Sequence, residues 1–329
     1  MATPATDPSD LTSQFLNKFM LPKIALTIIG IASLLGVSVT SWLEGIQDPF
    51  AIAARWLIFA TLGVLLGSSL WAGFILPWAE GVRPSPGAKA FLAAEGLRFR
   101  TLHRIVAAAG SVAVLAYLLV ALSGPDYPLR PLILAGEALM AALAFWLPAR
   151  GRQGARRAAI LSAMALALLA LAEVSAEGMA PGRDVLLWAL VRAVHLLAFG
   201  AWFGGAAWNI FINAASGRET LCLDTVIASH LQLEGFRKVV RVAFPTIVLT
   251  GLVQAGFLSG PNLGFFVGTG IGLAVLTKLG LAGALVVIFF TCPMWGACSP
   301  IAGVCNLEDL AQAPVAYDLS AVRMPHAGD

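Results

Sequence analysis

Long apolar runs alternate with short polar segments along the whole chain. Most runs approach or exceed the roughly 20 residues that a helix needs to cross a bilayer. They are too long and too evenly apolar for barrel strands, which alternate in polarity over about 10 residues. The pattern predicts an all-α polytopic membrane protein with eight transmembrane helices. The predicted spans are residues 24–42, 56–78, 105–122, 131–147, 158–174, 185–212, 242–258 and 263–290.

The composition excludes the main alternatives to a membrane protein. Of the 329 residues, 59% are hydrophobic and 12% are charged, whereas a soluble domain has about 25% charged residues. Disorder requires low hydrophobicity and high charge, and a soluble enzyme of this size could not bury so much apolar surface. The net charge of +3 gives no reason to expect a nucleic-acid partner. The lipid bilayer is therefore the first expected partner.

Lysine and arginine are distributed unevenly between the two sets of loops. Alternate loops and both termini carry sixteen of them, and the opposite loops carry only Arg130 and Arg183. The positive-inside rule then predicts a multi-pass protein of the bacterial inner (plasma) membrane with both termini in the cytoplasm. The periplasmic side would be acidic and could attract cations. Its acidic residues are Glu44, Asp48, Asp126, Glu173, Glu177 and Asp184.

The two ends of the chain are predicted to be cytoplasmic. Residues 1–23 show no cleavable signal peptide. Leu11, Phe15 and Phe19 have helical spacing, so this segment either lies on the inner membrane face or is a polar tail. Residues 293–329 form a tail that begins with cysteines.

The chain also repeats itself at an offset of 137 residues. Residues 24–153 and 154–292 are therefore predicted to be two four-helix repeats, which are parallel because each has an even number of spans. Gly63 and Gly67, like Gly200 and Gly204, form a small-xxx-small pair that allows close helix packing. The matching pairs are Arg55/Arg192, Gly63/Gly200, Gly67/Gly204, Trp71/Trp208, Phe74/Phe211, Phe99/Phe236, Arg100/Arg237 and Arg104/Arg241.

His195 is the leading candidate for a functional residue. It lies about ten residues into the sixth predicted helix, or about 15 Å at 1.5 Å per residue. A polar side chain at that depth is energetically costly, so we expect it to have a structural or functional role. It either binds a metal or carries a proton, or it is a structural histidine bonded to a neighbouring helix. Arg192 and Trp202 lie on a similar face of the same helix.

Two other charged residues lie inside predicted spans. Glu137 in the fourth helix and Lys278 in the eighth either form a structural ion pair or line a polar path with Arg192. His103 lies among arginines at the inner interface, where an interface role is favoured over a ligand role.

The cysteines that begin the tail are weak metal-ligand candidates. Cys292, Cys298 and Cys305 lack the CxxC spacing of zinc sites. In the cytoplasm a stable disulfide is not expected. Their thiols either bind metal or are incidental.

Motifs of catalysis are missing from the chain. We find no phosphate-binding loop and no HExxH, CxxCH or GxSxG motif, and we expect no enzyme activity. A haem held by two histidines would need a second mid-membrane histidine, which excludes a classical dihaem cytochrome.

The second half of the chain carries a recognisable succession of motifs. Arg192-x-x-His195 is followed by Trp202-x-Gly204-Gly205, then by Phe236-x4-Arg241-x-Ala243, Thr250-Gly251-Leu252 and Lys278-Leu279. This succession resembles the copper resistance protein D family of bacterial inner-membrane proteins, most clearly over residues 185–292. The motifs carry the resemblance onto His195, Trp202, Gly204, Gly205 and Lys278.

The resemblance implies a protein that moves copper ions between the periplasm and the cytoplasm or a membrane acceptor. His195 would be the intramembrane way-station, and a periplasmic copper-binding protein or a larger membrane complex is a candidate partner. The seven methionines form no soft-metal cage, so a transient or borrowed copper site fits better. One alternative is an accessory subunit of a respiratory or oxidase-type complex. Another is a membrane redox protein that uses a single haem or a quinone, with His195 as ligand.

Overall fold

In the computed structural model of this chain, residues 20–76, 86–122, 151–176, 184–220, 223–260 and 262–291 are described. Within these ranges the regular structure is entirely helical. Seven of the described helices are long and apolar enough to cross a membrane. The prediction of a helical multi-pass membrane protein is therefore confirmed. The predicted fourth span, residues 131–147, lies outside the described residues, so the count of eight stays a prediction.

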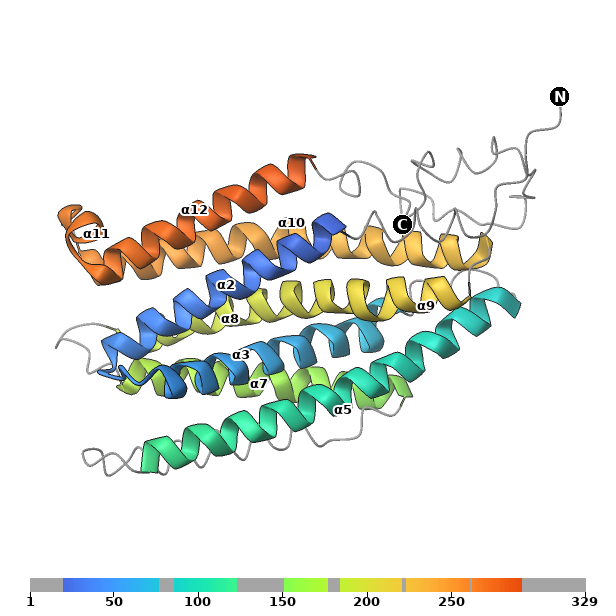
Figure 1. Cartoon of the computed structure of the whole chain (residues 1–329), viewed down its shortest axis with the longest axis horizontal. Helices are drawn as coiled ribbons and strands as arrows, with labels where there is room; N and C mark the ends of the chain where they lie inside the picture. The colour runs from blue at the N-terminus through green and yellow to red at the C-terminus, as the bar shows by residue number, and fades with distance from the viewer. Residues whose placement is uncertain are drawn as a thin grey trace.

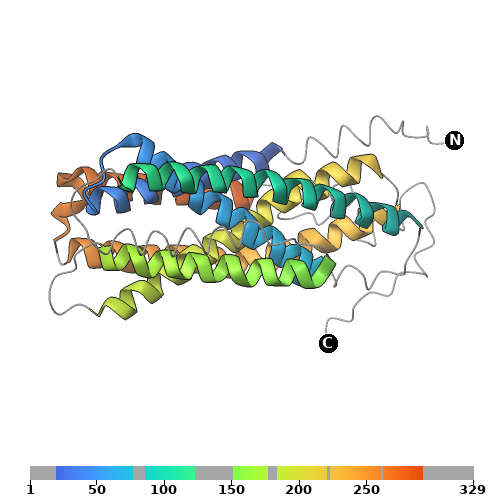
Figure 2. The same ribbon diagram turned by 90° about the horizontal axis from the view of Figure 1, so that it is seen from below.

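The long helices run side by side along one axis of the molecule in both views (Figures 1 and 2). Apolar side chains on the outer surfaces, such as Leu186 and Phe290, are exposed, as expected for helices that contact lipid. The elements are α2 (Met20–Leu43), α3 (Pro49–Leu70), η1 (Trp71–Ile75), α5 (Pro86–Leu122), α7 (Gly151–Ala176), α8 (Val185–Ala207), η2 (Trp208–Asn213), α9 (Ala214–Glu219), α10 (Leu223–Ser259), α11 (Gly264–Gly268) and α12 (Gly270–Thr291).

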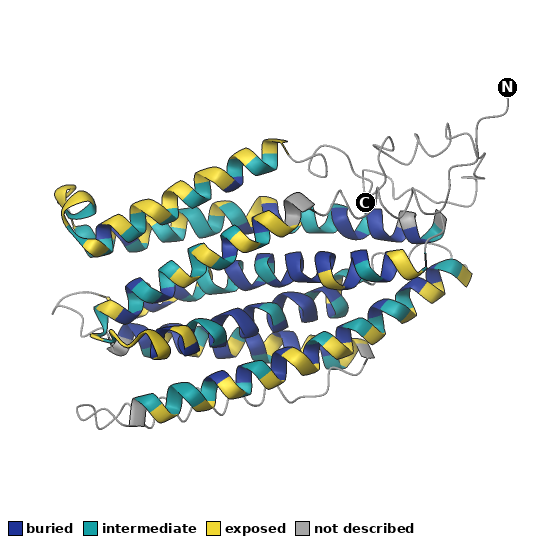
Figure 3. Ribbon diagram, in the orientation of Figure 1, coloured by how far each residue is buried: buried dark blue, intermediate teal, exposed yellow. Residues whose placement is uncertain are grey.

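The centre of the bundle is the crossing of α3 and α8, where the buried residues concentrate (Figure 3). A Cβ atom added to Gly67 would lie 2.5 Å from Cα of Gly204, and one added to Gly63 would lie 3.5 Å from Cα of Gly200. Since glycine has no side chain, the two backbones can approach this closely. The small-xxx-small pairs therefore lie at the close contact between these two helices.

Both central helices begin and continue in the same manner. Asp48 and Asp184 cap α3 and α8: Asp48 accepts a hydrogen bond from one backbone N–H group of the first turn, and Asp184 accepts from two. Both helices then change to π-helical geometry at Trp71 and Trp208. Such π segments are uncommon and often occur near functional sites.

Helices α5 and α10 begin much earlier than the predicted spans at residues 105 and 242. Each is 37 residues long, from Pro86 and Leu223. The extra turns of α5 carry a buried stripe at four-residue spacing, which consists of Phe91, Glu95, Phe99 and His103. The polar composition of these segments suggested loops, but packing of this stripe against the bundle stabilises helix.

The predicted span at residues 263–290 is divided into two helices. Thr269 has extended backbone geometry between α11 and α12, and its side chain accepts a hydrogen bond from the N–H of Gly272 at 2.9 Å. A Cβ atom on Gly272 would overlap the backbone of Phe265 and Phe266. This tight turn requires a glycine, and it lets α12 fold back along α2.

Candidate functional site

His195 lines a cavity between α2, α8, α10 and α12. The cavity has two adjoining lobes of about 130 Å³ each, which share His195, Arg192, Gln254 and Lys278 in their walls. We call it the His195 cavity. Its aromatic lobe is lined by Phe59, Phe199, Trp202 and Phe244. Its lateral lobe is lined by Trp188, Leu252, Leu258 and Leu279.

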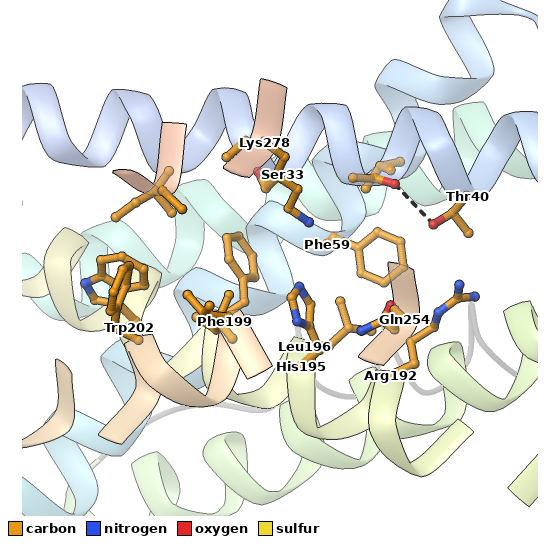
Figure 4. A pocket seen from close by; sticks show the side chains of 18 of the residues that line it. Ser33, Thr40, Phe59, Arg192, His195, Leu196, Phe199, Trp202, Gln254 and Lys278 are labelled. Carbon is orange, nitrogen blue, oxygen red and sulfur yellow. Dashed lines mark hydrogen bonds between the residues drawn. The ribbon is translucent and has the colours of Figure 1, made fainter. Parts of the chain in front are cut away.

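The hydrogen-bond contacts of His195 are the basis for assigning the proton to one ring nitrogen. Nδ1 lies 2.9 Å from Oγ1 of Thr250, and that hydroxyl donates to the backbone carbonyl of Thr246 at 2.6 Å. A hydroxyl has a single proton, and we therefore assign this bond to an Nδ1–H donor with Thr250 as acceptor. Nε2 therefore keeps its lone pair. Figure 4 shows the distal end of the imidazole directed toward Lys278 across the cavity.

Two hydrogen-bond donors in the cavity wall lack acceptors among the described residues. Lys278 takes part in no hydrogen bond or ion pair there, although its Nζ would lie 2.9 Å from a Cβ atom on Gly36. Nε2 of Gln254 is buried and has no partner. A buried donor without an acceptor costs roughly 1–3 kcal/mol. Among the described residues, the cavity wall near His195 therefore holds donors without acceptors.

The arginine of the cavity, Arg192, belongs to a buried ionic cluster of four residues. Arg55 binds Glu44 at 2.6 Å and also binds Glu173, and Arg192 lies 3.4 Å from Glu173. Two arginines and two glutamates balance in formal charge, and the guanidinium of Arg192 also lies over Trp188 at 5.4 Å. Lys278 is not a member of this cluster, and its charge has no ionic partner among the described residues.

The acidic residues that were predicted to attract cations have other contacts where the structure describes them. Glu44 and Glu173 bind arginine, and Asp48 and Asp184 cap helices. An acid that already holds a cation or a helix end attracts a further cation only weakly. Asp126 and Glu177 lie outside the described residues.

The other predicted site residues separate into three groups. Trp202 lies in the aromatic lobe, where its ring packs edge-on against Phe244 at 5.5 Å. Gly204 lies at the α3–α8 crossing, and Gly205 packs against Trp71 and Phe236, so neither glycine lines the cavity. The remaining candidates, Glu137, Cys292, Cys298 and Cys305, lie outside the described residues.

A second polar assembly, which we call the Glu95–Gln232 junction, joins α5, η2 and α10. Nε1 of Trp208 donates to Oε1 of Gln232 at 2.8 Å, and Nε2 of Gln232 donates to both carboxylate oxygens of Glu95 at 3.0 and 2.9 Å. All three side chains are buried. Sequence reasoning missed this pair, although Glu95 and Gln232 are also related by the 137-residue offset.

Sequence reasoning also missed Thr250, Gln254 and Glu173 as partners or wall residues of the site. Thr250 and Gln254 are polar, lie four residues apart and so share one face of an otherwise apolar span. That spacing was a usable signal. No pattern in the residues around Glu173 indicated that its carboxylate would bind arginines from two other helices.

The described residues assemble no group of three or more histidine, cysteine, aspartate or glutamate side chains that could hold a metal. A metal entering the His195 cavity would meet one imidazole nitrogen and the neighbouring cation Lys278. Copper(I) prefers thiolate, thioether and imidazole ligands. The cavity thus offers one suitable ligand.

No family model, curated protein or solved structure matches the chain.

Proposed function

We propose that this protein is a copper-handling membrane protein in which His195 binds the ion transiently. The observation that carries the proposal is the geometry of the imidazole. Its Nδ1–H group is held by Thr250, which leaves Nε2 with a free lone pair facing a cavity. A metal-binding histidine commonly donates its other N–H to a neighbouring oxygen in this manner.

The surrounding charges support brief binding rather than storage. One imidazole is a weak site for copper, and the nearby ammonium of Lys278 repels a cation. The remaining ligands would come from a periplasmic copper-binding protein or from a membrane acceptor. The proposed function is therefore passage of copper between the periplasm and the cytoplasm or such an acceptor.

Substitutions of His195 by residues of different softness test this function. His195→Gln keeps a polar side chain but is a poor copper(I) ligand, whereas His195→Met supplies a thioether. We expect cells with His195→Gln to lose protein-dependent copper accumulation, and cells with His195→Met to retain much of it. The measurement is cellular copper content, normalised to the amount of protein in the membrane.

The matched control is His103→Gln, because His103 is also buried but lies on α5, away from the cavity. It should leave copper accumulation unchanged. Full accumulation with His195→Gln would contradict the proposed function and assign His195 a structural role.

The proposed architecture is two parallel four-helix repeats with eight spans and both termini in the cytoplasm. Several features support it. Helices α5 and α10 have the same length, and equivalent residues meet in pairs, Gly67 with Gly204 and Glu95 with Gln232. A two-fold axis along the membrane normal brings equivalent positions of parallel repeats together in this manner.

Aromatic contacts add to this support because they are exchanged between the halves. Trp71 packs against Phe236 at 5.7 Å, and Phe99 packs against Trp208 at 5.6 Å. The 137-residue offset converts one pair into the other. Random packing of unrelated helices would not be expected to produce both contacts.

Accessibility labelling tests the topology. Single cysteines at positions 126 and 180 should react with a membrane-impermeant reagent from the periplasm, and cysteines at positions 87 and 154 should not. Labelling of all four from one side would contradict the proposed arrangement.

A further inference from the structure

The unsatisfied groups of the His195 cavity define what a ligand must provide. Nε2 of Gln254 is a buried donor without a partner among the described residues, and the ammonium of Lys278, which lines the same cavity, has no hydrogen bond or ion pair among them. Nε2 of His195 presents a lone pair that needs a donor or a metal. These groups come from three different helices and line one space (Figure 4). A complementary ligand therefore carries an acceptor on one side and a hydroxyl on another.

The charge of the cavity favours an electron-rich ligand. The Arg55, Arg192, Glu44 and Glu173 side chains balance one another, so Lys278 remains as a cation without an ionic partner among the described residues. A cation inside a membrane is costly unless something stabilises it. An oxygen-bearing ligand supplies that stabilisation.

The size and the walls of the aromatic lobe limit the ligand head to about one ring. The lobe measures about 130 Å³, and an engineered cavity of about 150 Å³ in another protein binds benzene. Phe199, Trp202 and Phe244 line this space, and aromatic rings pack favourably on one another. A haem is too large for it, whereas a single six-membered ring is not.

The lateral lobe connects this space with the lipid-facing surface between α10 and α12. Its walls include Leu252 and Leu279, which are 48% and 41% exposed on the outside of the bundle. Helix α12 packs mainly against α2 and only sparsely against α10. A hydrocarbon tail could therefore leave the cavity sideways into the bilayer.

We propose that the His195 cavity binds the ring of a quinol-type lipid, whose tail exits between α10 and α12. One ring hydroxyl donates to Nε2 of His195, and the oxygen on the other side of the ring accepts from Lys278 and Gln254. This site goes beyond copper handling and does not depend on it. The two ligands share His195, so they compete for the cavity.

Binding is tested with the purified full-length protein in lipid nanodiscs. The probe is decylhydroquinone, kept reduced under argon, and the readout is quenching of tryptophan fluorescence. Decylbenzene has the same ring and tail without oxygens, and decanoate offers a carboxylate without the ring. We expect saturable binding of decylhydroquinone and at least tenfold weaker binding of both controls.

Substitutions of residues in the wall of the His195 cavity test which side chains bind the ring. Lys278→Met and Gln254→Leu should each weaken decylhydroquinone binding, Lys278→Met by about tenfold or more, because hydrogen bonds that involve a charged group are the stronger ones. Lys238→Met, at an exposed lysine outside the cavity, is the matched control and should bind normally. Size-exclusion profiles show whether each variant is folded.

A second pair of variants tests the lateral entrance. Leu252→Trp fills the lateral lobe and should weaken binding, whereas Leu249→Trp, at an exposed position on the same helix outside the cavity wall, should not. Equal binding by both variants would overturn the proposed exit between α10 and α12.

The outcomes separate this proposal from the copper proposal. His195→Met should keep copper accumulation and lose decylhydroquinone affinity, and Lys278→Met should lose affinity without losing accumulation. Unchanged affinity in both Lys278→Met and Gln254→Leu would overturn the quinol site while leaving copper handling intact. Equal affinity for decanoate would overturn the assignment of a ring.

Discussion

The Glu95–Gln232 junction and the His195 cavity both contain polar side chains inside the bundle, but the hydrogen bonding of these side chains differs. In the junction, Trp208, Gln232 and Glu95 form a chain in which each donor meets an acceptor. In the cavity, Lys278 and Gln254 present donors to an open space. Burial alone therefore does not distinguish a structural polar residue from a functional one.

The difference shows that some buried hydrogen-bond donors of the described residues have acceptors and others do not. Buried polar groups are nearly always hydrogen-bonded, and exceptions require an explanation. The ionic cluster around Glu173 resembles the junction, because its charges are paired. Some unpartnered buried atoms of the described residues, such as Nε1 of Trp71 and Oγ of Ser162, lie outside the cavity. The open donors of the cavity differ from these because they line an open space, and we attribute them to ligand binding. Substitutions in the ionic cluster, in the junction and in the cavity should therefore differ strongly in their effect on stability.

The largest loss is expected for Glu173→Leu. It removes the acid that binds both Arg55 and Arg192, and breaking a buried ion pair costs about 3–5 kcal/mol. Thermal unfolding of the purified protein and its abundance in the membrane measure this loss. Glu219→Leu is the matched control, because Glu219 pairs with Arg98 at an exposed site, where a pair is worth about 0–1 kcal/mol. Equal effects would mean that the cluster is solvated.

An intermediate loss is expected for Gln232→Leu. This substitution leaves both Nε1 of Trp208 and the carboxyl group of Glu95 without a partner, at a cost of about 1–3 kcal/mol. The double variant Glu95→Leu/Gln232→Leu should recover part of the loss, since no buried carboxyl group then lacks a donor. A double variant that is less stable than Gln232→Leu by the full cost of Glu95→Leu would show that the two side chains are not coupled.

The smallest effect, and one of opposite sign, is expected for Lys278→Met. Lys278 has no hydrogen bond or ion pair among the described residues, so its replacement breaks none there and removes an uncompensated cation. The unfolding temperature of the ligand-free protein should stay the same or rise. A loss of more than about 1 kcal/mol would mean that Lys278 has a structural partner, which would make the cavity resemble the junction.

Much of the bundle could be predicted from local patterns, because the length of an apolar run is itself the physical requirement for crossing a bilayer. The polar first halves of α5 and α10 could not. Their composition resembles that of a loop, and they are helical because residues such as Phe91 and Phe99 are buried against the rest of the bundle.

The candidate site, too, could be predicted from local patterns only in part. The depth of His195 and the face that it shares with Arg192 follow from helical periodicity, and the structure places both on one cavity with Trp202 and Lys278. The motif residues Gly204 and Gly205 lie elsewhere, since a glycine inside an apolar helix has the same appearance in a sequence whether it shapes a passage or a helix crossing.

The sequence by itself determined that this chain crosses a membrane several times, because the length of each apolar run lies in the order of residues along the chain. Only the tertiary structure decided which polar groups are satisfied. Glu95 finds its partner 137 residues away, Glu173 joins arginines from two helices, and Lys278 finds none among the described residues. Pairing depends on distances across the bundle, and these exist only after the helices have packed.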